Sequence, residues 1–210
     1  MSSKKISKIE VQKKRKNRYS IYLDEEFAFG LDQDVLLKFG LCKGDELSEK
    51  KIEEILALEE KKTAKERAFR FLSYRDRSEK EIVDKLKEIG YKDSIVGWVL
   101  SELKRLKLID DARFAVSFAK SKIVSKPMGE YLLRRELLNK GISEKHILIA
   151  IEKAYQEKDQ KTVAAELTKK QVKRYENLET RKAKKRLSDL LLRRGFSWDV
   201  INDVLEGMDI

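Results

Sequence analysis

One pattern occurs three times in this 210-residue chain and limits its possible folds more than any other feature. It is seen in LKEIGYKDSIVGWVL (86–100), LLNKGISEKHILIAI (137–151) and LLRRGFSWDVINDVL (191–205). In each copy, apolar residues stand four before, one after, six after and ten after a glycine. These are inward-facing positions of two helices joined by a short turn, and glycine readily takes the left-handed conformation that ends the first helix. Chance similarity among Leu- and Lys-rich helices would not keep these positions together three times.

A further helix with an apolar stripe precedes each copy, at 64–75, about 111–124 and about 159–174. Because one amphipathic helix cannot bury its stripe alone, three helices make the smallest closed unit. The sequence therefore predicts a mainly α fold with three tandem three-helix, helix-turn-helix-like repeats. We expect them at 61–110, 111–158 and 159–210, stacked into an elongated, curved array.

Capping signals place several helix ends within this scheme. Ser78 and Glu81 have the S-x-x-E spacing of a capping box. Gly90 should end the helix that they begin, and Asp93 or Ser94 should cap the next one. Asp110 or Asp111 should cap the helix that starts near Ala112.

Residues 1–60 read differently and predict a small β-containing N-terminal module. ISKIEVQ and RYSIYL are rich in β-branched and aromatic residues, DEE at 24–26 suits a hairpin, and FAFG follows. We expect strands only within about the first 30 residues. DVLLKFG and SEKKIEEILALEE then predict two short helices, the first ended by Gly40 and the second capped by Ser48.

Composition excludes several classes of protein. Charged residues make up 40% of the chain and apolar residues 41%, so it should fold with a heavily solvated surface. No run of about 18 apolar residues exists for a membrane span, and the N-terminus lacks an apolar signal core. The single cysteine, Cys42, excludes an internal disulfide. We expect a cytoplasmic protein that does not contact membranes.

Motifs for catalysis are missing from the sequence. There is no P-loop, no G-x-G-x-x-G and no H-E-x-x-H. The only histidine, His146, has no Cys or His near it and is better explained by a surface or capping role. Asp110 and Asp111 could bind a cation, but helix capping explains them more simply. We therefore expect no enzyme activity, no metal and no cofactor, and look for a binding function.

Positive charge is concentrated in the repeats. Residues 1–60 carry 12 Lys and Arg against 13 Asp and Glu, whereas residues 61–210 carry 36 against 24, a net charge of +12. Such a body attracts phosphates or an acidic protein groove, although solubility alone is the alternative. The candidate binding residues are Arg67, Arg70, Arg75, Arg77, Arg134, Arg135, Lys140, Lys169, Lys170, Lys173, Arg174, Arg181, Lys182, Lys184, Lys185, Arg186, Arg193 and Arg194.

Because the repeats share one pattern, equivalent basic positions could recur along one face and suit a long groove or filament. The alternative is a solvated face with interspersed acids such as Glu130, Glu136 and Glu179. Tyr74 and Tyr175 lie beside the charges and could stack on bases or belong to the core.

LKLIDDARFAVSFAKSKI (106–123) resembles the segment that joins the first two units in the RecX family, bacterial modulators of the RecA recombinase. The Ile-Asp-Asp-x-Arg-Phe-Ala motif includes Asp110, Asp111, Arg113 and Phe114, which we expect to be mainly structural. The two later glycine segments and residues 5–47 are also similar to parts of the family. One stretch departs from it: SKPMGEYLL (125–133) has Pro127 and Gly129 rearranged before the second unit's central helix.

The resemblance implies a non-enzymatic regulator, mostly an inhibitor, that lodges in the groove of the RecA–DNA filament. It would limit filament extension, recombination and RecA's co-protease activity in DNA repair and the SOS response. It would also bind single- and double-stranded DNA without sequence preference. The alternative is a standalone nucleic-acid-binding protein or a helix-turn-helix transcription factor. A sequence-reading regulator usually dimerises to match paired half-sites, and the lack of a sustained heptad seam argues against that alternative. We expect a monomer.

Overall fold

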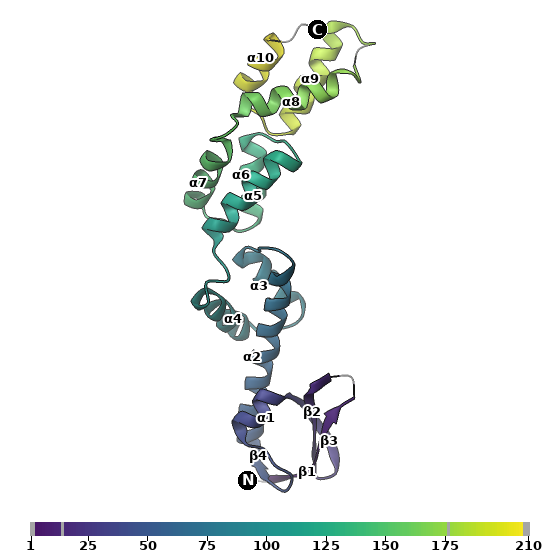
Figure 1. Ribbon diagram of the computed structural model, residues 1–210, viewed down its shortest axis with the longest axis vertical. Helices are drawn as coiled ribbons and strands as arrows, with labels where there is room; N and C mark the ends of the chain where they lie inside the picture. The colour runs from purple at the N-terminus through teal and green to yellow at the C-terminus, as the bar shows by residue number, and fades with distance from the viewer. Residues whose placement is uncertain (1–2, 14, 176, 208–210) are drawn as a thin grey trace. The chain divides into compact units, whose positions relative to one another are not determined.

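The computed structural model describes residues 3–13, 15–175 and 177–207, and its described part is mainly α-helical. The chain divides into two compact units. The first contains the chain up to residue 71 together with residues 86–102, and the second contains residues 72–85 and everything from residue 103 onward. Figure 1 labels the elements of both units.

The N-terminal module is a four-stranded antiparallel sheet in the order β3-β2-β1-β4. Its strands are β1 (Ser3–Gln12), β2 (Arg15–Leu23), β3 (Glu26–Asp32) and β4 (Glu46–Ser48). The hairpin predicted at 24–26 is confirmed: Asp24 and Glu25 have φ of 50° and 71°, as a tight two-residue turn requires. The expectation that strands end near residue 30 is wrong. β4 has only three residues, too few for an alternating pattern, and pairs with the open edge of β1.

Two helices follow the hairpin. α1 (Gln33–Phe39) ends at Gly40, whose φ of 60° confirms the predicted glycine stop. α2 runs over 26 residues, Glu49–Tyr74, and Ser48 caps it by accepting a hydrogen bond from the Lys51 amide at 3.3 Å. The short helix expected after Ser48 and the separate helix expected at 64–75 are therefore one helix. No Gly or Pro lies between them to stop it, and it crosses the predicted 60/61 boundary unbroken. The four domain ranges stay a prediction.

The N-terminal sheet packs on the first half of α2 through one apolar cluster and one polar one. Ile55 of α2 is fully buried in a cluster that includes Ile6, Ile21 and Leu31. Glu59, 7% exposed, accepts a hydrogen bond from the backbone amide of Asp32 at 2.8 Å. Arg18 of β2 reaches the other oxygen of Glu59, also at 2.8 Å. Because every charge in this contact is paired, burying it does not leave an isolated ion.

The remaining helices form the predicted repeats. The first repeat adds α3 (Glu79–Glu88) and α4 (Asp93–Arg105) to the end of α2. The second consists of α5 (Asp111–Ser125), α6 (Glu130–Asn139) and α7 (Glu144–Tyr155). The third consists of α8 (Gln160–Val172), α9 (Thr180–Arg193) and α10 (Trp198–Glu206). After Ser48, no strand occurs in the residues described.

The three glycines make the same turn. Gly90, Gly141 and Gly195 have φ of 102°, 78° and 83°. In every copy, the backbone amide of the residue after the glycine donates a hydrogen bond of 3.2 Å. The acceptor is the carbonyl of the leucine that stands four residues before the glycine. These leucines, Leu86, Leu137 and Leu191, are all fully buried. The glycine-centred pattern is thus confirmed as a helix C-terminal motif, in which a left-handed glycine ends the helix and the preceding leucine is buried.

Capping follows the prediction at two helices and differs at a third. The Ser78–Glu81 capping box is confirmed in both directions, with distances of 3.3 and 3.4 Å. Asp110 caps α5 by accepting from the Arg113 amide at 3.0 Å. At α4, however, the Val96 amide donates to the carbonyl of Lys92, so the helix starts one residue earlier than expected. Asp93 then lies in the first turn, where a carboxylate favours the helix dipole.

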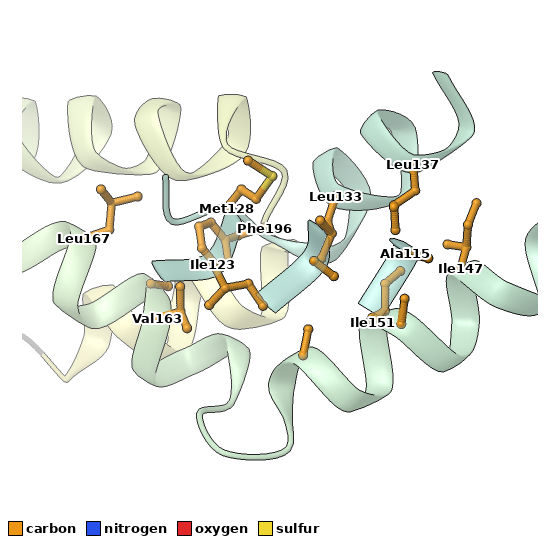
Figure 2. Close-up of a cluster of buried hydrophobic side chains, with 14 of the residues drawn as sticks. Ala115, Ile123, Met128, Leu133, Leu137, Ile147, Ile151, Val163, Leu167 and Phe196 are labelled. Atoms are coloured by element: carbon orange, nitrogen blue, oxygen red, sulfur yellow. The ribbon is translucent and has the colours of Figure 1, made fainter. Parts of the chain in front are cut away.

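The second and third repeats share one core. Figure 2 shows Ile123 of the second repeat near Val163 and Phe196 of the third, while Leu133, Leu137, Ile147 and Ile151 extend the same buried cluster away from that contact. Met128 and Phe196 are buried where the two repeats meet. Here a Cβ on Gly129 would lie 2.3 Å from the carbonyl oxygen of Gly195, so the backbones touch at a distance that excludes a side chain. The rearranged 125–133 stretch therefore supplies this contact.

Candidate functional site

Several of the candidate basic residues are held by acidic partners. Arg75 and Lys140 are two of them, since both bind Glu81. Arg75 donates to both oxygens of Glu81, at 3.0 and 2.8 Å, and Lys140 approaches one of them at 2.6 Å. These two cations thus hold the start of α3 against the end of α6, which makes their role mainly structural.

Glu81 is the residue that sequence reasoning underestimated. The S-x-x-E spacing revealed its bond to the Ser78 amide, but Lys140 is 59 positions away and nothing local points to it. Burial disfavours the charged carboxylate, yet hydrogen bonds from Arg75 and Lys140 outweigh burial and lower the pKa of Glu81 to about 2. Glu81 is therefore ionised over the whole physiological range.

The neighbouring family-motif residues also join the first two repeats. Asp111 accepts a hydrogen bond from the Glu79 amide at 2.9 Å, and burial raises the pKa of its carboxyl group. Phe114 is buried and stacks on Phe118 with ring centres 5.7 Å apart. Arg113 is exposed. The contacts of Asp110, Asp111 and Phe114 fit the structural role expected for the motif.

Two further cations of the second and third repeats have structural contacts. Arg134 pairs with Glu144 at 2.5 Å, whereas its neighbour Arg135 is exposed. Arg194 directs its guanidinium at the Pro127 carbonyl at 3.5 Å, and its own carbonyl accepts from the Gly129 amide at 2.9 Å. Arg134 and Arg194 are thus less available to a ligand than Arg135.

The first-repeat candidates fall in both compact units. Arg67 and Arg70 lie in the first unit and Arg75 and Arg77 in the second. The Arg67 side chain hydrogen-bonds Tyr91, whose hydroxyl pKa is raised because burial outweighs that bond. These four arginines are therefore divided between the two units.

The third repeat carries the largest group of available charges. We name it the third-repeat basic surface and define it as the end of α8 with the first half of α9. α8 buries Val163, Ala164, Leu167 and Thr168, and α9 buries Ala183, Leu187 and Leu191. The basic residues lie at the other positions. They are Lys169, Lys170, Lys173, Arg174, Arg181, Lys182, Lys184, Lys185 and Arg186.

In the part of the chain that the structure describes, only Lys182 of this surface forms an ion pair, a 3.1 Å contact with Glu179 on the same helix turn. α9 begins eight residues after α8 ends, and the two helices pack together, so the charges come from adjoining segments. Like charges at this density repel one another unless a polyanion or acidic surface neutralises them. This surface is the strongest candidate for binding phosphates.

The described residues include no metal-binding cluster. No group of three His, Cys, Asp or Glu side chains there could hold a metal ion. His146 lies in the first turn of α7 and is half-buried, and Cys42 is exposed. None of the described helices is long and apolar enough to cross a membrane.

Comparison with known proteins finds matches along most of the chain. Four family models match it: the regulatory protein RecX N-terminal domain over residues 4–48 and the first, second and third RecX three-helix domains over 64–103, 110–151 and 158–205. A regulatory protein RecX of Bacillus licheniformis is 38% identical over 204 residues, which cover 97% of this chain and 77% of that protein. One from Bacillus subtilis is 37% identical over the same shares.

Solved structures agree with these matches. A crystal structure of a regulatory protein RecX is 37% identical, with a TM-score of 0.73 over 97% of this chain and 99% of that one. A RecX structure from Lactobacillus salivarius is 26% identical, with a TM-score of 0.63 over 71% of this chain and 97% of that one. The matches thus define a class of regulatory proteins in which three-helix domains follow a small N-terminal domain in the sequence. The chain belongs to the RecX family.

Proposed function

We propose that this protein binds the RecA–DNA filament, without enzymatic activity of its own, and limits the filament's extension. In doing so it restrains recombination and the co-protease activity of RecA. The observation that carries the proposal is the third-repeat basic surface, whose lysines and arginines have almost no acidic partners among the described residues. The groove of a nucleoprotein filament offers the phosphates and acidic side chains that such a surface needs.

The repeated architecture supports a filament as the partner. A filament presents the same surface again at each subunit, and tandem repeats present similar helices one after another. A protein that engages neighbouring subunits at a growing end blocks all later additions. It therefore acts well below one molecule per RecA.

The test is a titration of RecA's DNA-dependent ATP hydrolysis with this protein. We expect inhibition at far less than one molecule per RecA, and weaker inhibition after Arg135→Glu, because Arg135 is exposed while Arg134 is held by Glu144. Arg134→Glu serves as the comparison and should affect inhibition less. If inhibition appears only when the DNA strand is saturated with this protein, direct contact with RecA is the wrong mechanism.

A second candidate is a DNA-binding protein that acts without RecA, with single- and double-stranded DNA as ligands and no sequence preference. The same basic surface favours it, because phosphate contacts alone give sequence-independent binding. Measured affinities for random and for selected duplexes separate this candidate from a transcription factor. A ratio near one excludes a sequence-reading regulator, which needs a ratio of at least about a thousand.

A further inference from the structure

Exposed aromatic side chains are scarce in the described part of the chain. Only Phe27, Tyr74, Tyr131 and Trp198 are more than half exposed there, at 60, 78, 67 and 56%. A large aromatic ring in water forgoes the stabilisation that burial would give it. Two of these four, Tyr131 and Trp198, come from different repeats yet belong to the same junction.

Backbone hydrogen bonds hold the two aromatic positions near each other. The Tyr131 amide donates to the Gly195 carbonyl at 3.2 Å, and the Gly129 amide donates to the Arg194 carbonyl at 2.9 Å. Trp198 follows Gly195 by three residues and begins α10. The close contact of Gly129 with Gly195 leaves no space for a side chain between the two backbone segments.

Both rings lie outside the core. α6 buries Leu133 and Leu137, while Tyr131 and Arg135, four residues apart on one side of that helix, are exposed. α10 buries Ile201 and Val204 and leaves Trp198 exposed. Arg193, at the end of α9 and two residues before Gly195, is also exposed. Two aromatic rings thus share one junction with two exposed arginines.

We propose that Tyr131 and Trp198 form a stacking site for unpaired nucleobases, with Arg135 and Arg193 binding the phosphates beside them. Base-on-aromatic stacking flanked by cations is how proteins bind single strands without reading sequence, because every base has a π-face. This inference rests on the DNA binding proposed above and assigns residues to the single-stranded part of it. The junction carries Arg135, Arg193 and Arg194 against Glu130 and Asp199, and this excess of positive charge favours a nucleic acid over an apolar protein partner.

The experiment is fluorescence and affinity measurement with a dT oligonucleotide and a duplex of equal length. In Trp98→Phe, where Trp198 is the only tryptophan, the oligonucleotide should quench the fluorescence and the duplex should not. Tyr131→Ala and Trp198→Ala should each weaken oligonucleotide binding about tenfold or more, and leave duplex binding unchanged. Trp198→Phe keeps an aromatic ring and should retain most of the affinity. Phe27→Ala is the control, because it removes an equally exposed ring from the N-terminal sheet.

Stacking also differs from phosphate binding in its salt dependence. Removing a stacking ring should lower affinity without changing the slope of log affinity against log salt, because no counterions are involved. Wild-type oligonucleotide affinity in both alanine variants, with helical circular dichroism intact, overturns the inference. Equal losses on oligonucleotide and duplex also overturn it.

RecA inhibition in the same variants separates this inference from the proposed function. If oligonucleotide binding is normal but inhibition of RecA is weakened, the junction is a protein contact: the inference fails and the proposed function stands. If oligonucleotide binding is weakened while inhibition of RecA is normal, the stacking site is real and the filament mechanism does not need it.

Discussion

At the scale of single residues, Glu81 shows how one carboxylate joins two repeats. We expect Glu81→Gln to lower the free energy of unfolding by about 1–3 kcal/mol at pH 7, because Arg75 and Lys140 lose a charged acceptor. Urea unfolding followed by circular dichroism measures this. Glu144→Gln is the matched control: it removes the exposed partner of Arg134 and should cost less than about 1 kcal/mol. Equal effects of the two substitutions would contradict the role given to Glu81.

The same residue makes stability depend on pH. The pKa of Glu81 is lowered from 4.5 to about 2 in the folded protein, so its contribution is complete above about pH 4.5. The contribution declines as the pH falls from there toward 2, because the unfolded chain takes up the proton first. Between these two values, the wild-type protein should lose stability more steeply than Glu81→Gln. Parallel curves for the two proteins would mean that the carboxylate is not ion-paired in solution.

At the scale of helices, two adjacent leucines test the assigned repeat positions. Leu137 is fully buried and Leu138 is 45% exposed. Leu137→Ala should cost about 2–5 kcal/mol because it leaves a cavity, whereas Leu138→Ala should cost about 0.5 kcal/mol or less. Chemical denaturation of both variants measures the difference. A cost below about 0.5 kcal/mol for Leu137→Ala would show that the apolar positions of the repeat do not lie on the buried faces of the helices.

The turn glycines differ in what surrounds them. At Gly90, with φ of 102°, an added Cβ meets nothing within 4 Å, so Gly90→Ala should cost only about 1–2 kcal/mol for the left-handed conformation. At Gly195 the Cβ would lie 2.4 Å from the Leu132 amide nitrogen, so Gly195→Ala adds a backbone clash. We expect the second substitution to lower the thermal midpoint clearly more than the first. Similar midpoints would argue against the close packing of the second and third repeats.

At the scale of helices and strands, some features could be predicted from the sequence and others could not. Glycine stops, capping boxes and apolar stripes act within a few residues, so the repeats and the ends of α1, α3 and α5 were predictable. The continuity of α2 could not be predicted, because capping residues and glycines signal where a helix ends, whereas no residue signals that two helical segments are joined. β4 depends on the free edge of β1. The sequence could list the basic residues but could not separate Lys140, which Glu81 holds, from the third-repeat lysines, which have almost no acidic partners.

At the scale of the whole molecule, net charge predicts DNA affinity that falls with salt, by a logarithmic slope of about −0.7 per contacted phosphate on single strands. Replacing Lys184, Lys185 and Arg186 by Ala should flatten that slope. The control replaces Lys104, Lys120 and Lys122 by Ala. This triple substitution removes the same charge, but these lysines are paired with Glu79, Glu157 and Glu136. Fluorescence anisotropy at several salt concentrations measures both slopes. Equal flattening would show that total charge, and not this surface, governs binding.

The backbone contact between Gly129 and Gly195 limits how the sequence of this protein can change. Elsewhere in the core, a larger side chain at one position is offset by a smaller one at its neighbour. Here an added Cβ would meet backbone atoms, those of Gly195 and Phe196 for Gly129 and those of Leu132 for Gly195, and backbone atoms cannot become smaller to accommodate it. The two positions are therefore expected to tolerate no substitution, singly or together, in a deep mutational scan that selects for folded protein. The surface residues around them should remain free to vary.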